Sequence, residues 1–212
     1  KITDAREARE WEGVALGSLG TAYDALGQYA KAIEHYTQAL AIARETGDRA
    51  GEGTRLGNLG NAYGALGQHA KNIECDTQAL AIAREIGNRQ SEAHVLGNLG
   101  LTHLQRLHDA AAALPWLQQS VAAWDAIWAD LATDRQRVTF GDTYAPVFHA
   151  RALQRAHARL GQPAEALVCA ERARSRAFEL LLAQQRLAGQ QQQQAPAAAG
   201  SSSTPSVSAA AA

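Results

Sequence analysis

The chain has 212 residues with a net charge of −1, and 46% of them are hydrophobic but only 6% aromatic. Its 20 basic and 21 acidic residues give a pI near 6.7, which excludes the strongly basic surface typical of proteins that bind a phosphate backbone. The apolar runs are shorter than the roughly 20 residues of a membrane span. We therefore expect neither nucleic acid nor a membrane as a partner.

The N-terminus and the cysteines indicate a reducing compartment. The first residues are charged and lack the apolar core of a signal peptide. The two cysteines, Cys75 and Cys169, are too few and too far apart for a disulfide framework or a zinc site. We expect an intracellular, cytoplasmic protein.

The sequence repeats itself at a spacing of 40 residues. Residues 16–55 and 56–95 are identical at about 26 of 40 positions, and a third copy opens at residue 96 and diverges after Thr102. The match also extends backwards to Ile2, which predicts that residues 1–15 are the end of a preceding repeat, cut inside its second helix. Because the chain contains no methionine, we expect it to be a piece of a longer protein.

Each unit predicts two helices. In the second helix of the first unit, apolar residues recur at steps of three and four, from Ala32 through Tyr36 to Ala43. A similar stripe marks the first helix. Glycines recur where each helix should end, as at Gly27 and Gly47, and they suit the left-handed residue that follows many helices.

The order of these residues resembles the signature of the tetratricopeptide repeat (TPR). The resemblance rests on Leu16, Leu19, Gly20, Tyr23, Leu26, Gly27, Tyr29, Ala32, Tyr36, Ala39 and Leu40. Leu16 stands where that motif often has Trp, and Arg44 where it often has Pro. The 40-residue period, with Ala-Arg-Glu-x-Gly-Asp/Asn-Arg at each junction, is similar to that of kinesin light chains. The resemblance implies an all-α, right-handed superhelical array (α-solenoid) of helix-turn-helix units that form a core by stacking.

The rest of the chain is assigned by the same frame. We predict a first repeat over 16–55, a second over 56–95, an irregular third over 96–142 with an extended second helix, and a degenerate fourth over 143–188. In the third unit an extra residue enters near Arg106, Asp109 is a candidate helix cap, and Pro115 predicts a kink or a fresh start. Residues 189–212 are so rich in Gln, Ala and Ser that we predict a disordered linker.

Three segments, 139–148, 160–166 and 171–180, are similar to the region that precedes the caspase-like domain of TPR-CHAT proteins. The His and Cys of such a protease lie downstream in that family. Nothing in this chain corresponds to them.

The sequence carries no catalytic or metal-binding pattern. Its seven histidines and two cysteines occur without HExxH, CxxC, GxSxG or P-loop spacing, so we expect no enzyme, no cofactor and no metal site. Cys75 falls on a partly exposed helix face, and Cys169 reads as a small buried residue. Trp116, Trp124 and Trp128 share one side of a helix and are expected in the core.

The resemblance implies a ligand groove lined by the first helix of each unit. The family's ligand-contact positions fall here on Ser18, Thr21 and Asp24, on Asn58, Asn61 and Gly64, and on Asn98, Leu101 and Gln105. Asn58 and Asn98 recur at the same position, and an amide offers both a donor and an acceptor to an extended peptide backbone. We predict a protein or peptide partner. The alternative is that these amides form hydrogen bonds with nearby backbone groups of their own helix.

Some groove features argue against an acidic ligand. Gly17, Gly57 and Gly97 stand where TPR domains that grip acidic chaperone C-termini carry Lys, so a carboxylate clamp is not expected. The run Arg172, Arg174 and Arg176 is either a contact for an acidic partner or a solvated face.

The second unit carries a local exception in its second helix. Asn72 and Asp76 replace the Ala32 and Tyr36 of the first unit, so that unit should bury less apolar surface if both side chains face the next helix pair.

We therefore predict a protein–protein interaction scaffold within a larger signalling protein. Two alternatives are the regulatory or substrate-recruiting arm of a caspase-like (CHAT) protease whose catalytic domain lies outside this chain, and the sensor array of a signal-transducing ATPase. The sequence names neither the ligand nor the oligomeric state.

Overall fold

The computed structural model describes residues 2–141 and 144–194, with side chains over 5–140 and 147–190. The elements are α1 (Ile2–Ala25), α2 (Tyr29–Thr46), α3 (Arg49–Ala65), α4 (His69–Glu85), α5 (Arg89–Leu101), the π-helix η1 (Thr102–Arg106), α6 (Ala110–Ala129), α7 (Asp134–Gly141), α8 (Tyr144–Arg159) and α9 (Pro163–Gln194). This part of the chain contains no strand. None of its helices combines the length and the apolar character needed to cross a membrane.

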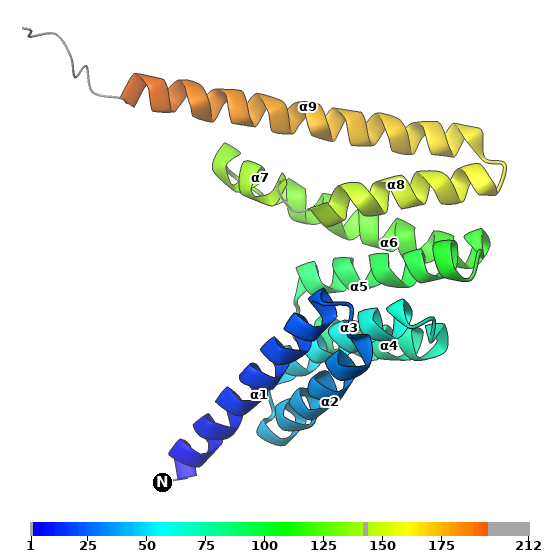
Figure 1. The fold of residues 1–212 in the computed structure, drawn as a ribbon. Coiled ribbons are helices and arrows are strands. Elements are labelled where there is room, and N and C mark those ends of the chain that lie inside the picture. Colours follow the sequence, from blue (N-terminus) through cyan, green and yellow to red (C-terminus); the bar gives the residue numbers. More distant parts are fainter. Residues whose placement is uncertain (1, 142–143, 195–212) are drawn as a thin grey trace, which may run out of the picture.

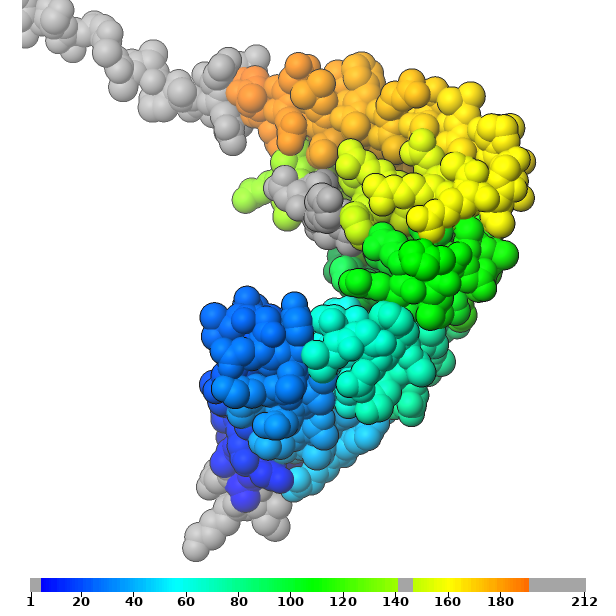
Figure 2. All heavy atoms as spheres, turned by 45° about the vertical axis from the view of Figure 1, so that its right-hand side comes forward, coloured from blue at the N-terminus to red at the C-terminus, as the bar shows by residue number. Residues whose placement is uncertain are grey.

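The helices pair into hairpins that stack on one another. α1 packs on α2, α3 on α4, α5 on α6 and α8 on α9, while α2 with α3 and α4 with α5 join successive hairpins. The stack rises from α1 and α2 to α9 (Figure 1). It curves around an open hollow, with the first hairpin on one side and α8 and α9 on the other (Figure 2). The predicted all-α array of helix-turn-helix units is confirmed.

The chain reverses at the residues that the repeat pattern marks. Gly47 ends α2 with φ 74°, a left-handed conformation that glycine adopts without a Cβ clash. Positive φ values of 67–74° recur at Gly27, Gly67, Gly87 and Gly161. Asp48 then caps α3 by accepting from the Gly51 N–H at 2.8 Å, and Asn88 caps α5 by accepting from Ser91 at 3.0 Å.

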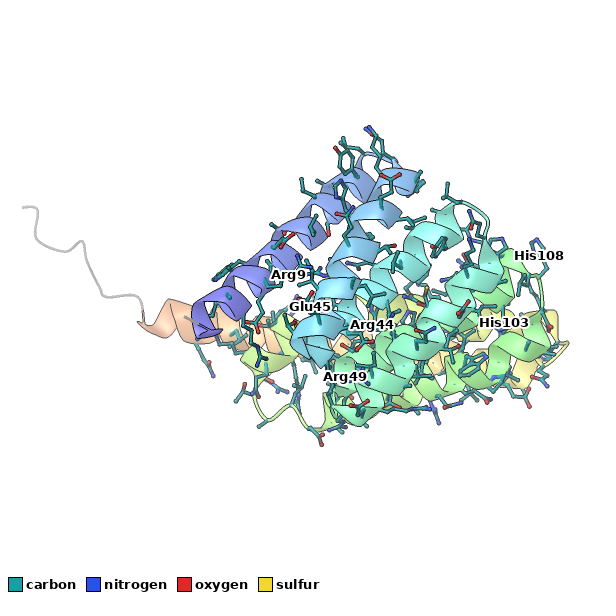
Figure 3. All side chains as sticks on the ribbon, turned by 90° about the horizontal axis from the view of Figure 1, so that it is seen from below. Arg9, Arg44, Glu45, Arg49, His103 and His108 are labelled. Atoms are coloured by element: carbon teal, nitrogen blue, oxygen red, sulfur yellow. The ribbon has the colours of Figure 1, made fainter. Side chains whose placement is uncertain are left out.

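A row of ion pairs joins the hairpins at the Ala-Arg-Glu-x-Gly-Asp/Asn-Arg junctions. Arg9 lies 3.0 Å from Glu45, and Arg49 makes the equivalent contact one repeat later. Glu52 is 7% exposed and accepts from both Arg44 and Arg49. Burial alone would raise the pKa of Glu52, but these hydrogen bonds more than offset it and lower the pKa. Figure 3 shows Arg9 on α1 near Glu45 and Arg44 at the end of α2 and Arg49 at the start of α3.

The start of the chain differs from the prediction for residues 1–15. α1 runs without a break from Ile2 to Ala25, so these residues do not form a separate end of a preceding repeat. The positions 40 residues before Gly47 and Asp48 are Glu7 and Ala8. Neither favours the left-handed turn, and Ala8 cannot cap a helix, so the helix continues.

The unit boundaries also differ from the predicted ones. α3 begins at Arg49, so the predicted boundary between residues 55 and 56 falls inside a helix. In the third unit the extra residue is taken up by η1 and by His108 at φ 56°. Asp109 caps α6, as predicted, by accepting from Ala112 at 2.9 Å. α6 continues through Pro115, which therefore does not start a new helix.

The last hairpin consists of α8 and α9. α9 extends to Gln194, so residues 189–194 are helical rather than part of the predicted disordered linker. Gln and Ala are good helix formers, which accounts for the longer helix. Residues 195–212 of that linker lie outside the described residues.

The core follows the stack. One apolar cluster runs from Ala32 in α2 to Leu99 in α5, and two smaller ones hold α6 to the elements around it. Trp124 and Trp128 are buried, and Trp116 packs against the first cluster, as predicted.

Asn72 and Asp76 form a buried polar group beside this core. The Asn72 amide donates to Asp76 Oδ2 at 3.0 Å and its carbonyl accepts from the Thr102 hydroxyl at 2.6 Å. Asp76 is fully buried, and its Oδ1 has no hydrogen-bond partner among the described residues. Burial raises the pKa of Asp76 to about 7, which the hydrogen bond from Asn72 offsets only in part.

Candidate peptide-binding groove

The predicted groove residues lie on the first helix of each hairpin or directly after it. Ser18, Thr21 and Asp24 are on α1, Asn58 and Asn61 on α3, Asn98 and Leu101 on α5, and Gln105 in η1. All of them are exposed or half-buried, and Leu101 also packs against the core cluster of the third and fourth hairpins.

The polar members of this set differ in their hydrogen bonds. The Ser18 and Thr21 hydroxyls each donate to the carbonyl four residues earlier at 3.0 Å, so they are engaged within α1. The amides of Asn58, Asn61 and Asn98 make no side-chain hydrogen bond to any described residue. Three amides on neighbouring first helices are therefore available to a ligand.

The glycines that precede Ser18, Asn58 and Asn98 differ in what lies against them. A Cβ on Gly17 would lie 2.2 Å from the Arg55 guanidinium, and one on Gly97 would lie 2.0 Å from the His149 ring. A Cβ on Gly57 would meet nothing within 4 Å. The glycine is thus covered in the first and third hairpins and open in the second, where Val95 stands one repeat after Arg55.

His149 of α8 covers Gly97 in the third hairpin. The Trp124 indole N–H donates to His149 Nδ1 at 3.2 Å, and the Ser120 hydroxyl lies 2.9 Å from the same nitrogen. Burial, with a smaller contribution from His94, lowers the pKa of His149 to about 4. The ring is therefore neutral near pH 7 and serves as a structural acceptor over Gly97.

Two hollows lie elsewhere on the described surface. One of about 380 Å³ lies between α1, α2 and α3 and is lined by Val14, Ile42 and Arg55 among others. The other, of about 390 Å³, is lined by Arg151, Gln154, Arg155 and Ala158 of α8. Neither Arg151 nor Arg155 pairs with a described residue.

The α8 arginines were not predicted from the sequence. Aligning Leu160-Gly161 with Leu26-Gly27 places Arg151 at the position of Gly17 and Arg155 at that of Thr21. This signal was present, but the fourth unit departs too far from the motif for its groove positions to stand out.

The remaining candidate residues do not form a second binding site. Arg176 lies 2.6 Å from Asp125 and stacks over Trp128, so part of the predicted arginine run binds within the molecule. Cys75 is half-buried, and burial raises the pKa of its thiol to about 11. Cys169 is half-buried rather than fully buried. Within the described residues no group of three His, Cys, Asp or Glu side chains could hold a metal ion.

Comparison with known proteins identifies the class. Residues 13–45 and 51–126 match two family models described as Tetratricopeptide repeat. No curated protein sequence gives a significant match.

Solved structures give the same fold. BtubC (BKLC) from P. vanneervenii superposes with a TM-score of 0.66 at 20% identity, over 78% of this chain and 63% of that one. A kinesin light chain of P. anserina with nearly identical TPR-like repeats superposes with a TM-score of 0.58 at 24% identity, over 78% of this chain and 74% of that one. This chain thus spans less than two thirds of the length of BtubC.

The fold and the repeat matches define an α-solenoid with a right-handed superhelix. The chain belongs to the tetratricopeptide repeat family, and these repeats support a role as a protein-interaction scaffold. The similarity of residues 139–180 to TPR-CHAT proteins stays a prediction.

Proposed function

We propose that the groove of α1, α3 and α5 binds an extended peptide segment, chiefly through the peptide main chain. The observation that carries the proposal is the set of free amides, Asn58, Asn61 and Asn98, beside the uncovered Gly57. Each amide presents one acceptor and two donor hydrogens, the complement of a peptide unit. Because Gly57 has no side chain, the main chain of a bound peptide can approach it closely.

The geometry supports a modest affinity. The groove contains few charges, and ordering a flexible peptide offsets much of the contact energy, so we expect binding in the micromolar range. Added salt should weaken such binding little, because neutral hydrogen bonds are not screened as ion pairs are.

The test starts from peptides selected from a displayed random library against the whole chain. Calorimetric titration of a selected peptide should give about thirtyfold weaker binding to the Asn58→Ala, Asn98→Ala double variant. Two lost hydrogen bonds of roughly 1 kcal/mol each account for this change. Circular dichroism should give unchanged helix content.

A matched variant distinguishes binding in this groove from binding in the hollow on α8. Arg151→Ala with Arg155→Ala removes two charges from α8 and should leave the affinity within about twofold. Equal binding by the wild type and the asparagine variant contradicts the proposal. A steep loss with salt that disappears in the arginine variant moves the site to α8.

A further inference from the structure

α1 presents an apolar stripe that no described part of the chain covers. Trp11 is 73% exposed, Leu19 48% and Leu26 69%. The small residues Ala15, Ser18 and Ala22 lie between them and are also exposed. Steps of three and four residues place all six on one helix face, which Leu26 prolongs by donating its N–H to the Ala22 carbonyl at 3.1 Å. No ionisable side chain belongs to this stripe.

Two of these six positions, those of Leu19 and Ala22, are buried in the later hairpins, whereas Leu66, one repeat after Leu26, is 43% exposed. Leu59 and Leu99, one and two repeats after Leu19, are 4% and 0% exposed and belong to the core cluster of α2 to α5. Ala62, one repeat after Ala22, is 0% exposed. At Leu19 and Ala22 the stripe on α1 therefore continues the surface by which α3 and α5 join their neighbours.

Figures 1 and 3 both place α1 at an outer edge of the molecule, with α2 on one side only. Trp11 stands where the later repeats have Gly51 and Ser91, so the largest apolar side chain of the stripe is a feature of α1 alone. Stacking of repeats does not require it.

The stripe is also self-complementary. Its members are placed symmetrically about the midpoint between Ser18 and Leu19, with Ala15 mirrored by Ala22 and Trp11 by Leu26. Two such helices running antiparallel bring the alanines together and set each Trp11 against the partner's Leu26. Small residues in the middle allow close approach, and large apolar residues at both ends fill the flanks.

We propose that this stripe binds a second copy of the chain, forming a twofold dimer through antiparallel α1 helices. The contact buries apolar surface on both copies without enclosing a charge. It covers Ser18, whose hydroxyl already donates to the Val14 carbonyl. It leaves Asn58, Asn61 and Asn98 on α3 and α5 free, so the amide contacts of the proposed peptide groove do not depend on it.

Two double variants of the whole chain test the arrangement. In the antiparallel dimer residue 15 faces residue 22 of the other copy. Ala15→Glu with Ala22→Glu places like charges opposite each other, whereas Ala15→Glu with Ala22→Lys places opposite charges there. Both positions are exposed in the single chain, so each variant should keep the helix content and the melting behaviour of a folded chain.

Sedimentation equilibrium over a hundredfold range of protein concentration is the measurement. We expect the wild type and the Glu/Lys variant to be dimers and the Glu/Glu variant to be a monomer. A monomeric wild type, or a dimeric Glu/Glu variant, overturns the proposal. Loss of the dimer in both variants overturns it as well, because parallel helices would set position 15 against position 15 of the other copy and so place like charges together in both. Open-ended growth instead of a dimer would indicate head-to-tail stacking and would also overturn it.

Discussion

Asp76 is the residue at which this repeat departs most from its neighbours. It stands where the first repeat has Tyr36, beside Gly60, and its Oδ1 is buried without a partner among the described residues. An ionised carboxylate is costly in such a site, whereas a protonated one can remain there. The pKa of Asp76 is therefore raised.

This shift predicts a dependence of stability on pH. The pKa of Asp76 rises from its ordinary value of 3.8 to about 7 in the folded chain. Between these values the folded state binds a proton that the unfolded state has lost, so the free energy of unfolding falls as pH rises. The expected slope is about 1.4 kcal/mol per pH unit, with no further loss above about pH 7.

The measurement is urea unfolding of the wild type and of Asp76→Asn from about pH 4 to about pH 8. Other titrating groups, His149 included, are common to both proteins, so the difference in unfolding free energy isolates Asp76. The wild type should lose stability relative to the variant up to about pH 7. Parallel curves would contradict the assigned burial and show that Asp76 has a compensating partner.

At the scale of a helix, the repeated glycines have different surroundings in spite of identical sequence frames. Gly57 faces open space, whereas Gly97 is covered by the His149 ring. Both lie within helices, where glycine is less favourable than alanine by up to about 1 kcal/mol. Whether an added methyl group raises the free energy of unfolding therefore depends on the side chain that a later helix places against the glycine.

We expect Gly57→Ala to raise the free energy of unfolding by about 0.5–1 kcal/mol. Gly97→Ala should lower it by about 1–3 kcal/mol, since the methyl group displaces His149 from its Trp124 hydrogen bond. Chemical unfolding of the two variants compares them directly. Effects of the same sign at both positions would rule out the covering of Gly97 by α8.

At the scale of the whole molecule, the stack is a quasi-one-dimensional array in which each hairpin contacts its neighbours. A side chain therefore contributes according to how many hairpins surround it. Leu59 lies inside the stack and Leu19 at its edge, although the two occupy the same repeat position.

Leu59→Ala should cost about 3 kcal/mol of unfolding free energy, as expected for a buried leucine that leaves a cavity. Leu19→Ala should cost less than about 1 kcal/mol in dilute protein, where α1 is exposed. Thermal and urea unfolding at low concentration test the pair. A similar cost for both would indicate that another surface covers Leu19 even in dilute solution.

The sequence by itself determined the local repeat. Helix periods, turn glycines such as Gly47 and caps such as Asp48 act over a few residues, so the hairpins and their 40-residue spacing could be predicted from residue order. The groove positions rest on the resemblance to the family, and their role in binding stays a prediction. Where a local signal was missing, as at Glu7 and Ala8, the predicted unit boundary was wrong.

Only the tertiary structure decided which copies of a repeated position are covered. Arg55 over Gly17, His149 over Gly97 and the buried Asp76 depend on the side chain that the next helix supplies. The exposure of Leu19 against the burial of Leu59 depends on whether a neighbouring hairpin is present. Contacts between residues far apart in the chain determine burial and pKa, and a repeated motif repeats the residues without repeating those contacts.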